Sequence, residues 1–455
     1  MNKTKKGSPL KRNAALTLGA MGVVYGDIGT SPIYAFNEAV HAGGDTRSEI
    51  LGVLSLVFWT LTIVVSIKYL IFVLNADNKG EGGTLAMFSQ FSEKIRTGRK
   101  GLMGFTVFIF LMAAALEFAD GILTPAISVT SAVEGVKTIS PDLAFLVVPL
   151  TVLILAVLFI FQFKGTHKIG TIFGPVMVLW FLVIAFMGVS QIIKNPESLV
   201  ALNPMYALEF IEAHSFQTLF VMSSVILAVT GAEALYSDLG HFGKGPIRFG
   251  WFALAGLALP LNYFGQGALL LRDPSAQGNT FFGMAGPGLP ALALLLVTTF
   301  ATIIASQALI SAVASLASQA VQLGFLPRIR IQHTNKQERG QIYVPFVNAA
   351  VGVGAIVLVI IFKSSSALAG AYSLSIAGTM LVSTIGLIIL AVSKWKAQKF
   401  ILLPIFTVFL ILDLSLLIAS STKFVTGAWI PVLIGFCLAS MMWIWRKGRL
   451  ELNAQ

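Results

Sequence analysis

An aspartate stands within an apolar segment near the start of the chain, in VVYGDIGTSPIYAF (residues 23–36). Gly26 and Gly29 each lower helix propensity by about 1 kcal/mol, and Pro32 cannot donate to the carbonyl four residues before it. Released carbonyl oxygens in an apolar setting need a partner. A carboxylate beside them, followed by two hydroxyls, offers oxygen ligands for a dehydrated monovalent cation. We therefore expect Asp27 to bind a cation; a proline kink whose aspartate pairs with a neighbouring helix is the alternative.

A second acidic group lies in LEFADGILTPAISV, where Asp120, Thr124 and Ser128 are spaced by four residues. Residues at this spacing share one face of a helix. One carboxylate and two hydroxyls in a stripe indicate a polar path beside the first site. The alternative is that the two hydroxyls bond back to their own helix. Glu117, one turn earlier, is interpreted as a charge at the rim.

A third group lies in AVTGAEALYSDLGHFG, where Thr230 and Glu233 flank a glycine. Loss of water favours the neutral form of a carboxyl group, so Glu233 can take up and release a proton near neutral pH. A structural glutamate held by hydrogen bonds is the alternative. Asp238 and His241 follow, and we expect them to form a solvated cap.

Two tyrosines, Tyr34 and Tyr372, bring phenolic oxygens into two further apolar segments. Taken alone, a tyrosine in such a segment is usually an interfacial anchor.

The elements that position these residues must be membrane helices. The chain has 455 residues, of which 56% are hydrophobic and 11% charged, and its mean hydropathy is +0.84. A soluble domain carries about 25% charged residues. The net charge of +11 lies in short loops between apolar runs, which is typical of membrane orientation and not of nucleic-acid binding. The single cysteine, Cys437, excludes an intrachain disulfide.

A membrane-spanning helix needs about 20 apolar residues, and on that basis the sequence predicts twelve spans. They lie near residues 14–40, 49–74, 101–136, 143–163, 169–193, 215–239, 249–271, 288–322, 342–362, 366–393, 398–420 and 427–445. With the N-terminus inside, the inner segments hold 24 Lys and Arg residues and the outer loops hold 6. This bias predicts a multi-pass protein of the cell membrane with both termini cytoplasmic.

The first and sixth spans are both interrupted, at GDIGTSP and at VTGAEA. Interrupted helices in corresponding places indicate an inverted-repeat transporter. The predicted divisions are a basic cytoplasmic N-terminus (1–13), a first five-helix repeat (14–193), an extracellular loop (194–214) and a second repeat (215–393). Two further helices (394–445) and a short cytoplasmic tail (446–455) follow.

Other chemistries have weak support. The five histidines are scattered without metal-ligand spacing. KGEGG lacks the strand and helix context of a phosphate loop, and no G-x-S-x-G elbow is present. We expect neither an enzyme nor a cofactor.

The chain resembles the KUP/HAK/KT family of potassium-uptake transporters along nearly its whole length. The resemblance is carried by GVVYGDIGTSPIYA, NKGEGGT, DGILTPAISVTSAVEG, GTHKIGTIFGPVM, AVTGAEALYSDLGHFG, NYFGQGALLL, ATIIASQALISAV and GQIYVPFVN. It implies an all-α membrane protein with twelve transmembrane helices. Ten of them would form a LeuT-like five-plus-five inverted repeat with broken helices 1 and 6, and two would be extra.

The resemblance also implies proton-coupled potassium import. It assigns the ion site to Asp27, Tyr34, Asp120, Thr124, Ser128, Thr230 and Tyr372, with Glu233 added for proton coupling. Many members of the family carry a cytosolic domain after the last span, which helps them to dimerise.

Our prediction from the sequence is a symporter that brings K⁺ inward with H⁺. Asp27 and Asp120 would be the anionic ligands of the monovalent ion and would share in proton coupling, and Glu233 would carry the proton. The expected partners are K⁺, H⁺ and the lipid bilayer, with a homodimer left open and no nucleic acid. The alternatives are an amino-acid or polyamine transporter of the same fold, an intramembrane aspartyl protease and a channel.

Overall fold

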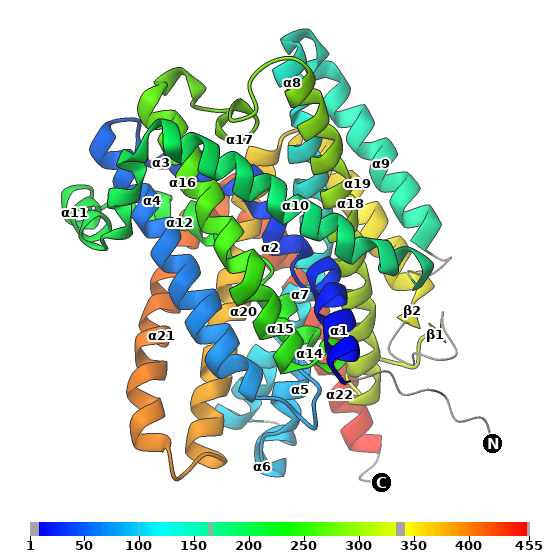
Figure 1. Cartoon of the computed structure of the whole chain (residues 1–455). Helices are drawn as coiled ribbons and strands as arrows, with labels where there is room; N and C mark the ends of the chain where they lie inside the picture. The colour runs from blue at the N-terminus through cyan, green and yellow to red at the C-terminus, as the bar shows by residue number, and fades with distance from the viewer. Residues whose placement is uncertain (1–8, 99, 163–166, 334–341, 453–455) are drawn as a thin grey trace.

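The computed structural model describes residues 9–98, 100–162, 167–333 and 342–452, which form an almost wholly helical bundle (Figure 1). In these residues, eleven helices are long and apolar enough to cross a membrane. They are Arg47–Asn75, Gly101–Ile139, Pro141–Phe161, Ile172–Lys194, Gln217–Ser237, Lys244–Arg272, Leu289–Gln322, Pro345–Phe362, Ser365–Ser393, Lys399–Ser421 and Phe424–Leu452. The first expected span is not among them, because its helix is broken into short pieces.

Most spans consist of one long α-helix, in places extended by a π or 3₁₀ turn. They are α4 (Arg47–Leu61) with η2 (Thr62–Phe72) and η3 (Val73–Asn75), α7 (Gly101–Glu134), α9 (Val147–Phe161), α10 (His167–Lys194), α15 (Lys244–Gly250) with η8 (Trp251–Ala255) and α16 (Gly256–Arg272), α18 (Leu289–Gln322), α19 (Pro345–Phe362), α20 (Ser365–Ser393), α21 (Lys399–Ser421), and η10 (Phe424–Ala428) with α22 (Trp429–Leu452). A helix satisfies its own backbone groups, as the interior of a bilayer requires.

The first predicted span is interrupted where the sequence predicts it. It consists of α1 (Pro9–Val23), α2 (Gly26–Thr30), the 3₁₀ turn η1 (Ser31–Ile33) and α3 (Ala35–Gly43). Pro32 lies within η1, where its ring prevents an α-helical hydrogen bond. The break is buried: Asp27 is 3% exposed and Thr30 is fully buried.

The sixth span is interrupted as well. Here α12 (Gln217–Val225) tightens into η7 (Ile226–Val229), and α13 (Ala232–Ser237) and α14 (Leu239–Phe242) follow. Gly231 connects the two halves with a φ of 82°, a left-handed conformation that glycine adopts without steric cost. The sequence therefore predicted both interruptions correctly.

The two broken spans lie inside the bundle. α2 packs against α18 and α7, η7 packs against α4 and α20, and α13 packs against η2 and α18. The short elements between spans lie at the two ends of the bundle in Figure 1, with α8 (Val136–Ile139), α11 (Met205–Ala213) and α17 (Thr280–Gly283) at one end and α5 (Thr84–Ser89) and α6 (Glu93–Arg96) at the other.

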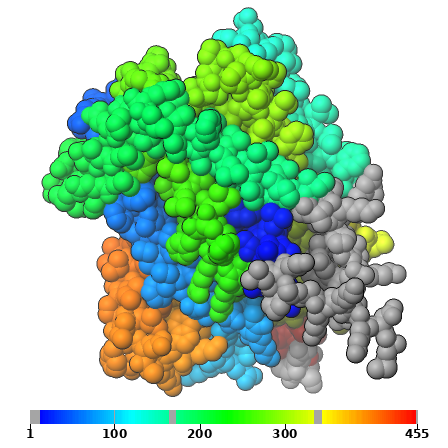
Figure 2. Space-filling model, viewed as in Figure 1, coloured from blue at the N-terminus to red at the C-terminus, as the bar shows by residue number. Residues whose placement is uncertain are grey.

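The outer surface of the bundle is apolar. On α10 and α21, which lie on the face shown in Figure 2, Phe186, Ile193, Val408 and Ile411 are each more than 60% exposed. Exposed side chains of this kind on long helices face lipid, not water. The described structure therefore fits a multi-pass membrane protein.

Three features differ from the sequence prediction. The last helix ends at Leu452 and not near residue 445, because the charged end of α22 stays helical although its hydropathy falls. Residues 194–214 are not only loop, since they contain η6 (Pro196–Leu202) and α11. The fold also has one small antiparallel strand pair, β1 (Gln332–His333) with β2 (Ile342–Tyr343). Most of the predicted basic N-terminus and the end of the tail lie outside the described residues.

The other short elements are η4 (Pro141–Leu146) before α9 and η9 (Pro274–Ala276) after α16.

Candidate cation-binding site

The two helix breaks face each other at the centre of the bundle. A Cβ atom added to Gly231 would lie 2.8 Å from the backbone nitrogen of Ile28 and 3.0 Å from the Asp27 carboxylate. Only a glycine allows this approach, in both space and backbone conformation. In the fold, the interruption of the sixth span therefore lies against the Asp27 carboxylate of the first span.

Asp27 keeps one carboxylate oxygen without a partner. The Tyr372 hydroxyl donates to Oδ2 at 3.4 Å, but the buried Oδ1 has no hydrogen bond within the described part of the chain. A buried anion without a partner is costly, so this oxygen is suited to bind a cation. In the described residues, the hydrogen bond that the Asp27 side chain accepts from a neighbouring helix comes from the Tyr372 hydroxyl, and no basic side chain pairs with it.

The carbonyls at the first break are less available than the sequence suggested. The Thr30 hydroxyl donates to the Asp27 carbonyl at 2.9 Å, and the Ser31 hydroxyl donates to the Ile28 carbonyl at 2.8 Å. The Ser31 bond takes the place of the one that Pro32 cannot make. Both hydroxyl groups therefore satisfy backbone carbonyls at the break. Because their protons are used in these bonds, they can offer an ion only the lone pairs of their oxygens.

The acidic stripe of the third span lies on α7, which continues unbroken through Pro125. The Thr124 hydroxyl lies 2.5 Å from that of Tyr372, and Ser128 Oγ lies 3.5 Å from Thr30 Oγ1. These hydroxyls thus contact other spans and do not bond back to their own helix. Asp120, on the same face, has a buried Oδ1 without a hydrogen-bond partner in the described residues.

Tyr34 and Thr230 complete the predicted set. Their hydroxyl oxygens are 3.5 Å apart, and the Thr230 hydroxyl donates to the carbonyl of Leu227 at 3.0 Å. Both residues are buried. Tyr372 is buried too, and it bridges the first and third spans, so it is not an interfacial anchor. Residues distant in sequence are therefore brought together by direct contacts.

Glu233 lies in a small polar cluster that the sequence did not indicate. Its Oε1 accepts hydrogen bonds from the Tyr69 hydroxyl at 3.0 Å and the Thr379 hydroxyl at 3.2 Å. Tyr69 belongs to η2, whose π-helical turn widens the second span at this point. The only signal for Tyr69 and Thr379 in the sequence is that each is a polar residue within an apolar segment.

A cavity of about 610 Å³, including its open mouth, is bordered by Asp27, Asp120 and Glu233. Five carboxyl-bearing residues line it, and none of its described lining residues is Lys, Arg or His; the five are Asp27, Glu117, Asp120, Glu233 and Asp238. Like charges at short range cannot all remain ionised in a low-dielectric setting. Bound cations or protons must therefore compensate them. In the described residues, no group of three or more His, Cys, Asp or Glu side chains has the geometry to hold a metal ion.

One intramembrane aspartate is neutralised by a basic residue. Lys68 and Asp413 form a salt bridge of 2.7 Å in which both side chains are fully buried. The Lys68 ammonium also donates to the Met380 carbonyl at 3.0 Å, and the Thr384 hydroxyl donates to Asp413 at 2.5 Å. Both charges were visible in the sequence, but their pairing was not predicted, since it joins the second and eleventh spans.

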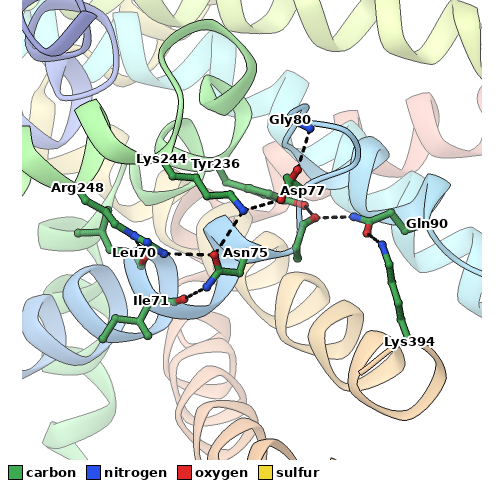
Figure 3. Close-up of polar contacts among 11 residues, drawn as sticks. Leu70, Ile71, Asn75, Asp77, Gly80, Gln90, Tyr236, Lys244, Arg248 and Lys394 are labelled. Carbon is green, nitrogen blue, oxygen red and sulfur yellow. Dashed lines mark hydrogen bonds and ion pairs between the residues drawn. The ribbon is translucent and has the colours of Figure 1, made fainter. Parts of the chain in front are cut away.

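At the end of the bundle that carries α5 and α6, polar contacts fix the segment after η3 (Figure 3). The Tyr236 hydroxyl and the Gln90 amide both donate to the Ala76 carbonyl at 2.5 Å. Lys244 forms an ion pair of 2.6 Å with Asp77. Although partial burial of Asp77 opposes it, the Lys244 ammonium and the Gly80 N–H hold the pKa of Asp77 below its usual value.

Asp238 and His241 lie 3.3 Å apart, as a pair near the end of α13. Asp238 is only 6% exposed. The prediction of a solvated cap is therefore wrong for the aspartate, which is packed against the cavity.

The fold and the site define a multi-pass membrane protein with a buried cavity at two helix breaks. Carboxyl groups line this cavity, and no basic residue of the described part of the chain does. The chain belongs to the KUP/HAK/KT family, because the model of the K⁺ potassium transporter integral membrane domain matches residues 14–450. It is therefore a member of a family of transporters and not of enzymes.

Relatives from two bacteria extend the match. The chain is 48% identical to the probable potassium transport system protein Kup 2 of Paramagnetospirillum magneticum, over 99% of this chain and 70% of that protein. It is also 48% identical to the probable potassium transport system protein Kup of Chlorobium phaeobacteroides, over 97% of this chain and 70% of that protein. A crystal structure of the Eremococcus coleocola manganese transporter is 15% identical, with a TM-score of 0.48, over 97% of this chain and 96% of that one.

Proposed function

We propose that this protein imports potassium ions together with protons across the cell membrane. The single observation that carries the proposal is that Asp27 and Asp120 line one cavity and each keeps a buried carboxylate oxygen without a hydrogen-bond partner in the described residues. Tyr34, Thr124, Ser128, Thr230 and Tyr372 would supply neutral oxygen ligands. The membership of a potassium transporter family supports K⁺ as the ion.

Glu233 is the proton carrier in this proposal, with Asp27 and Asp120 sharing the proton as the cation enters and leaves. The charge balance of the cavity supports it, because carboxyl groups without a base need protons whenever fewer cations are bound. Two positive charges moving inward gain roughly 4.6 kcal/mol per 100 mV of inside-negative potential. This supports uptake against a concentration ratio of about a thousandfold. The proposal needs no cofactor beyond the transported ions.

The proposed architecture has twelve spans, with the broken α1–α3 segment as the first. Ten of them form a LeuT-like inverted repeat of residues 14–193 and 215–393, and two follow. The facing breaks in the first and sixth spans support this arrangement. The excess of Lys and Arg in the inner segments supports cytoplasmic termini.

The test is uptake of radioactive rubidium by reconstituted Glu233→Gln protein under an inward proton gradient. Because the amide keeps the shape but neither gains nor loses a proton near neutral pH, we expect acid-driven uptake to fall at least about tenfold. The matched control is Glu212→Gln, on the exposed surface of α11, which should transport normally. Undiminished acid-driven uptake by the Glu233→Gln protein would refute the role of Glu233.

A further inference from the structure

We infer that Glu117 is a second proton-transfer residue, which passes the transported proton from the central carboxyl groups to the cytoplasmic water. This inference rests on the proposed function. The sequence suggested only a rim charge, but the structure places Glu117 in the wall of the cavity that Asp27, Asp120 and Glu233 also line.

The position of Glu117 along α7 gives the direction of the transfer. It lies three residues before Asp120, which is about 4.5 Å along the helix axis and on the same face. α7 begins at Gly101, directly after the Lys- and Arg-rich inner segment 75–100. Glu117 is therefore nearer to the inner end of the cavity than Asp120 is.

The rest of the wall near Glu117 comes from the same end of the molecule. Gly82, Gly83, Ser237 and Gln319 line the cavity there. The Gly82–Gly83 turn is pressed against α13, since a Cβ atom on Gly82 would lie 1.9 Å from the Tyr236 carbonyl oxygen. The cavity thus extends from the helix breaks to a turn of the inner segment.

A hydroxyl of that inner segment holds the Glu117 carboxyl group. Thr84, the first residue of α5, donates to Oε1 of Glu117. The titratable groups that share the cavity with Glu117 are Asp27, Asp120, Glu233 and Asp238, and Tyr236 of α13 is close by. None of the described lining residues is basic, so no fixed positive charge holds Glu117 permanently ionised.

The proposed step needs no other reagent. Protonated Glu233 gives its proton, through cavity water, to the Glu117 carboxylate, and the bond that forms is the O–H of Glu117. Glu117 then gives the proton to water at the inner mouth and returns to the carboxylate. The O–H bond of Glu233 breaks in the first transfer and that of Glu117 breaks in the second, so both groups end as carboxylates and one proton has moved inward. Glu233 then takes its next proton from the outside water, which restores the state from which the step began.

The experiment measures rubidium uptake into oriented proteoliposomes at a fixed external pH while the internal pH is varied. Wild-type uptake should rise several-fold between internal pH of about 6.5 and 8.5, because an alkaline interior accepts the proton. In Glu117→Gln this dependence should fall below about twofold, while the KM for external rubidium stays within about twofold of wild type.

Two further variants make the result specific. Glu117→Asp keeps a carboxyl group and should retain the dependence on internal pH. Glu134→Gln changes a glutamate at the far end of the same helix, where it accepts a hydrogen bond from Ser365, and should behave as wild type. The chromatographic profile of each purified variant shows whether it is folded.

The outcomes separate the two proposals. If wild-type uptake shows no dependence on either internal or external pH, the proposed symport itself is wrong. If the wild type depends on internal pH and Glu117→Gln keeps the same profile, only the role of Glu117 is overturned. A raised KM with an unchanged pH profile would make Glu117 a cation ligand, which also overturns the inference.

Discussion

Two intramembrane aspartates of this protein have opposite surroundings. Asp413 is fully buried and accepts hydrogen bonds from an ammonium and a hydroxyl, so its charge is balanced within the protein. Asp27 is equally deep but keeps an oxygen without a described partner, next to a broken helix. Burying an uncompensated carboxylate is expensive in a membrane. The difference supports the proposal that Asp27 binds the ion, whereas Asp413 is balanced by Lys68.

The Tyr372 hydroxyl is expected to tune cation affinity, since it contacts both Thr124 and Asp27. Tyr372→Phe removes one hydrogen bond of about 1 kcal/mol and one neutral oxygen ligand. We predict that the KM for rubidium rises about 5- to 10-fold, with the protein still folded. Uptake kinetics measure this, with Tyr206→Phe on α11 as control. An unchanged KM would remove Tyr372 from the site.

The Lys68–Asp413 pair gives a prediction about stability. Lys68→Met leaves the Asp413 carboxylate buried without its counter-charge, which costs about 3–5 kcal/mol. The melting temperature in detergent should therefore drop clearly. The double variant Lys68→Met with Asp413→Leu should recover most of the loss, since a buried pair can be replaced by apolar residues. A double variant as unstable as the single one would contradict this account.

At the scale of elements, the meeting of the two helix breaks determines the geometry of the site. Gly231→Ala would force a side chain into a left-handed conformation and against Ile28 and Asp27. We predict a loss of stability of at least about 1 kcal/mol and loss of uptake. Gly245→Ala is the control, because no atom lies within 4 Å of its added Cβ. Normal uptake by Gly231→Ala would show that the breaks do not need this close contact.

The sequence predicted the breaks and the polar residues beside them because each departs from its apolar surroundings. Asp27, Asp120 and Glu233 stand out for this reason, and four-residue spacing links Asp120 to its hydroxyls. The partners Tyr69 and Thr379 were missed, because which helices become neighbours is a property of the packed bundle and not of any single segment.

The first and last residues of a helix could be predicted only where the hydropathy of the sequence changes at the same residue at which the helix begins or ends. The end of α22 remains helical through Arg449 to Leu452, where the sequence is already polar. The π-helical turn of η2, which carries both Lys68 and Tyr69, has no sequence signal of its own. Hydropathy reports the environment of a segment, whereas backbone geometry also depends on its neighbours.

At the scale of the whole molecule, the end of the bundle that carries α5 and α6 is held by contacts between segments that are distant in sequence. Asp77 joins the turn after η3 to α15 through Lys244 (Figure 3). Because the pKa of Asp77 is lowered in the folded protein, its stabilisation is present above its ordinary pKa and is lost as the pH falls through the lowered value.

We predict that Asp77→Asn destabilises the protein by less than about 1 kcal/mol at neutral pH, since solvent reaches both partners of this pair. The difference between variant and wild type should shrink as the pH falls below the ordinary pKa of an aspartate, and it should vanish once the pH is below the lowered pKa of Asp77, where wild-type Asp77 is protonated as well. Melting temperatures in detergent across pH measure this. A difference that stays equally large from neutral pH to the most acidic pH at which the protein remains folded would exclude an ionic contribution.

The central claim is that the facing helix breaks bind a dehydrated alkali cation between Asp27 and Asp120. Anomalous diffraction from crystals grown with rubidium in place of potassium tests it most directly. The account predicts an anomalous peak within coordination distance of both carboxylates and of the Thr124 hydroxyl. Carboxylates that contact only protein groups, with no anomalous peak between them, would contradict it.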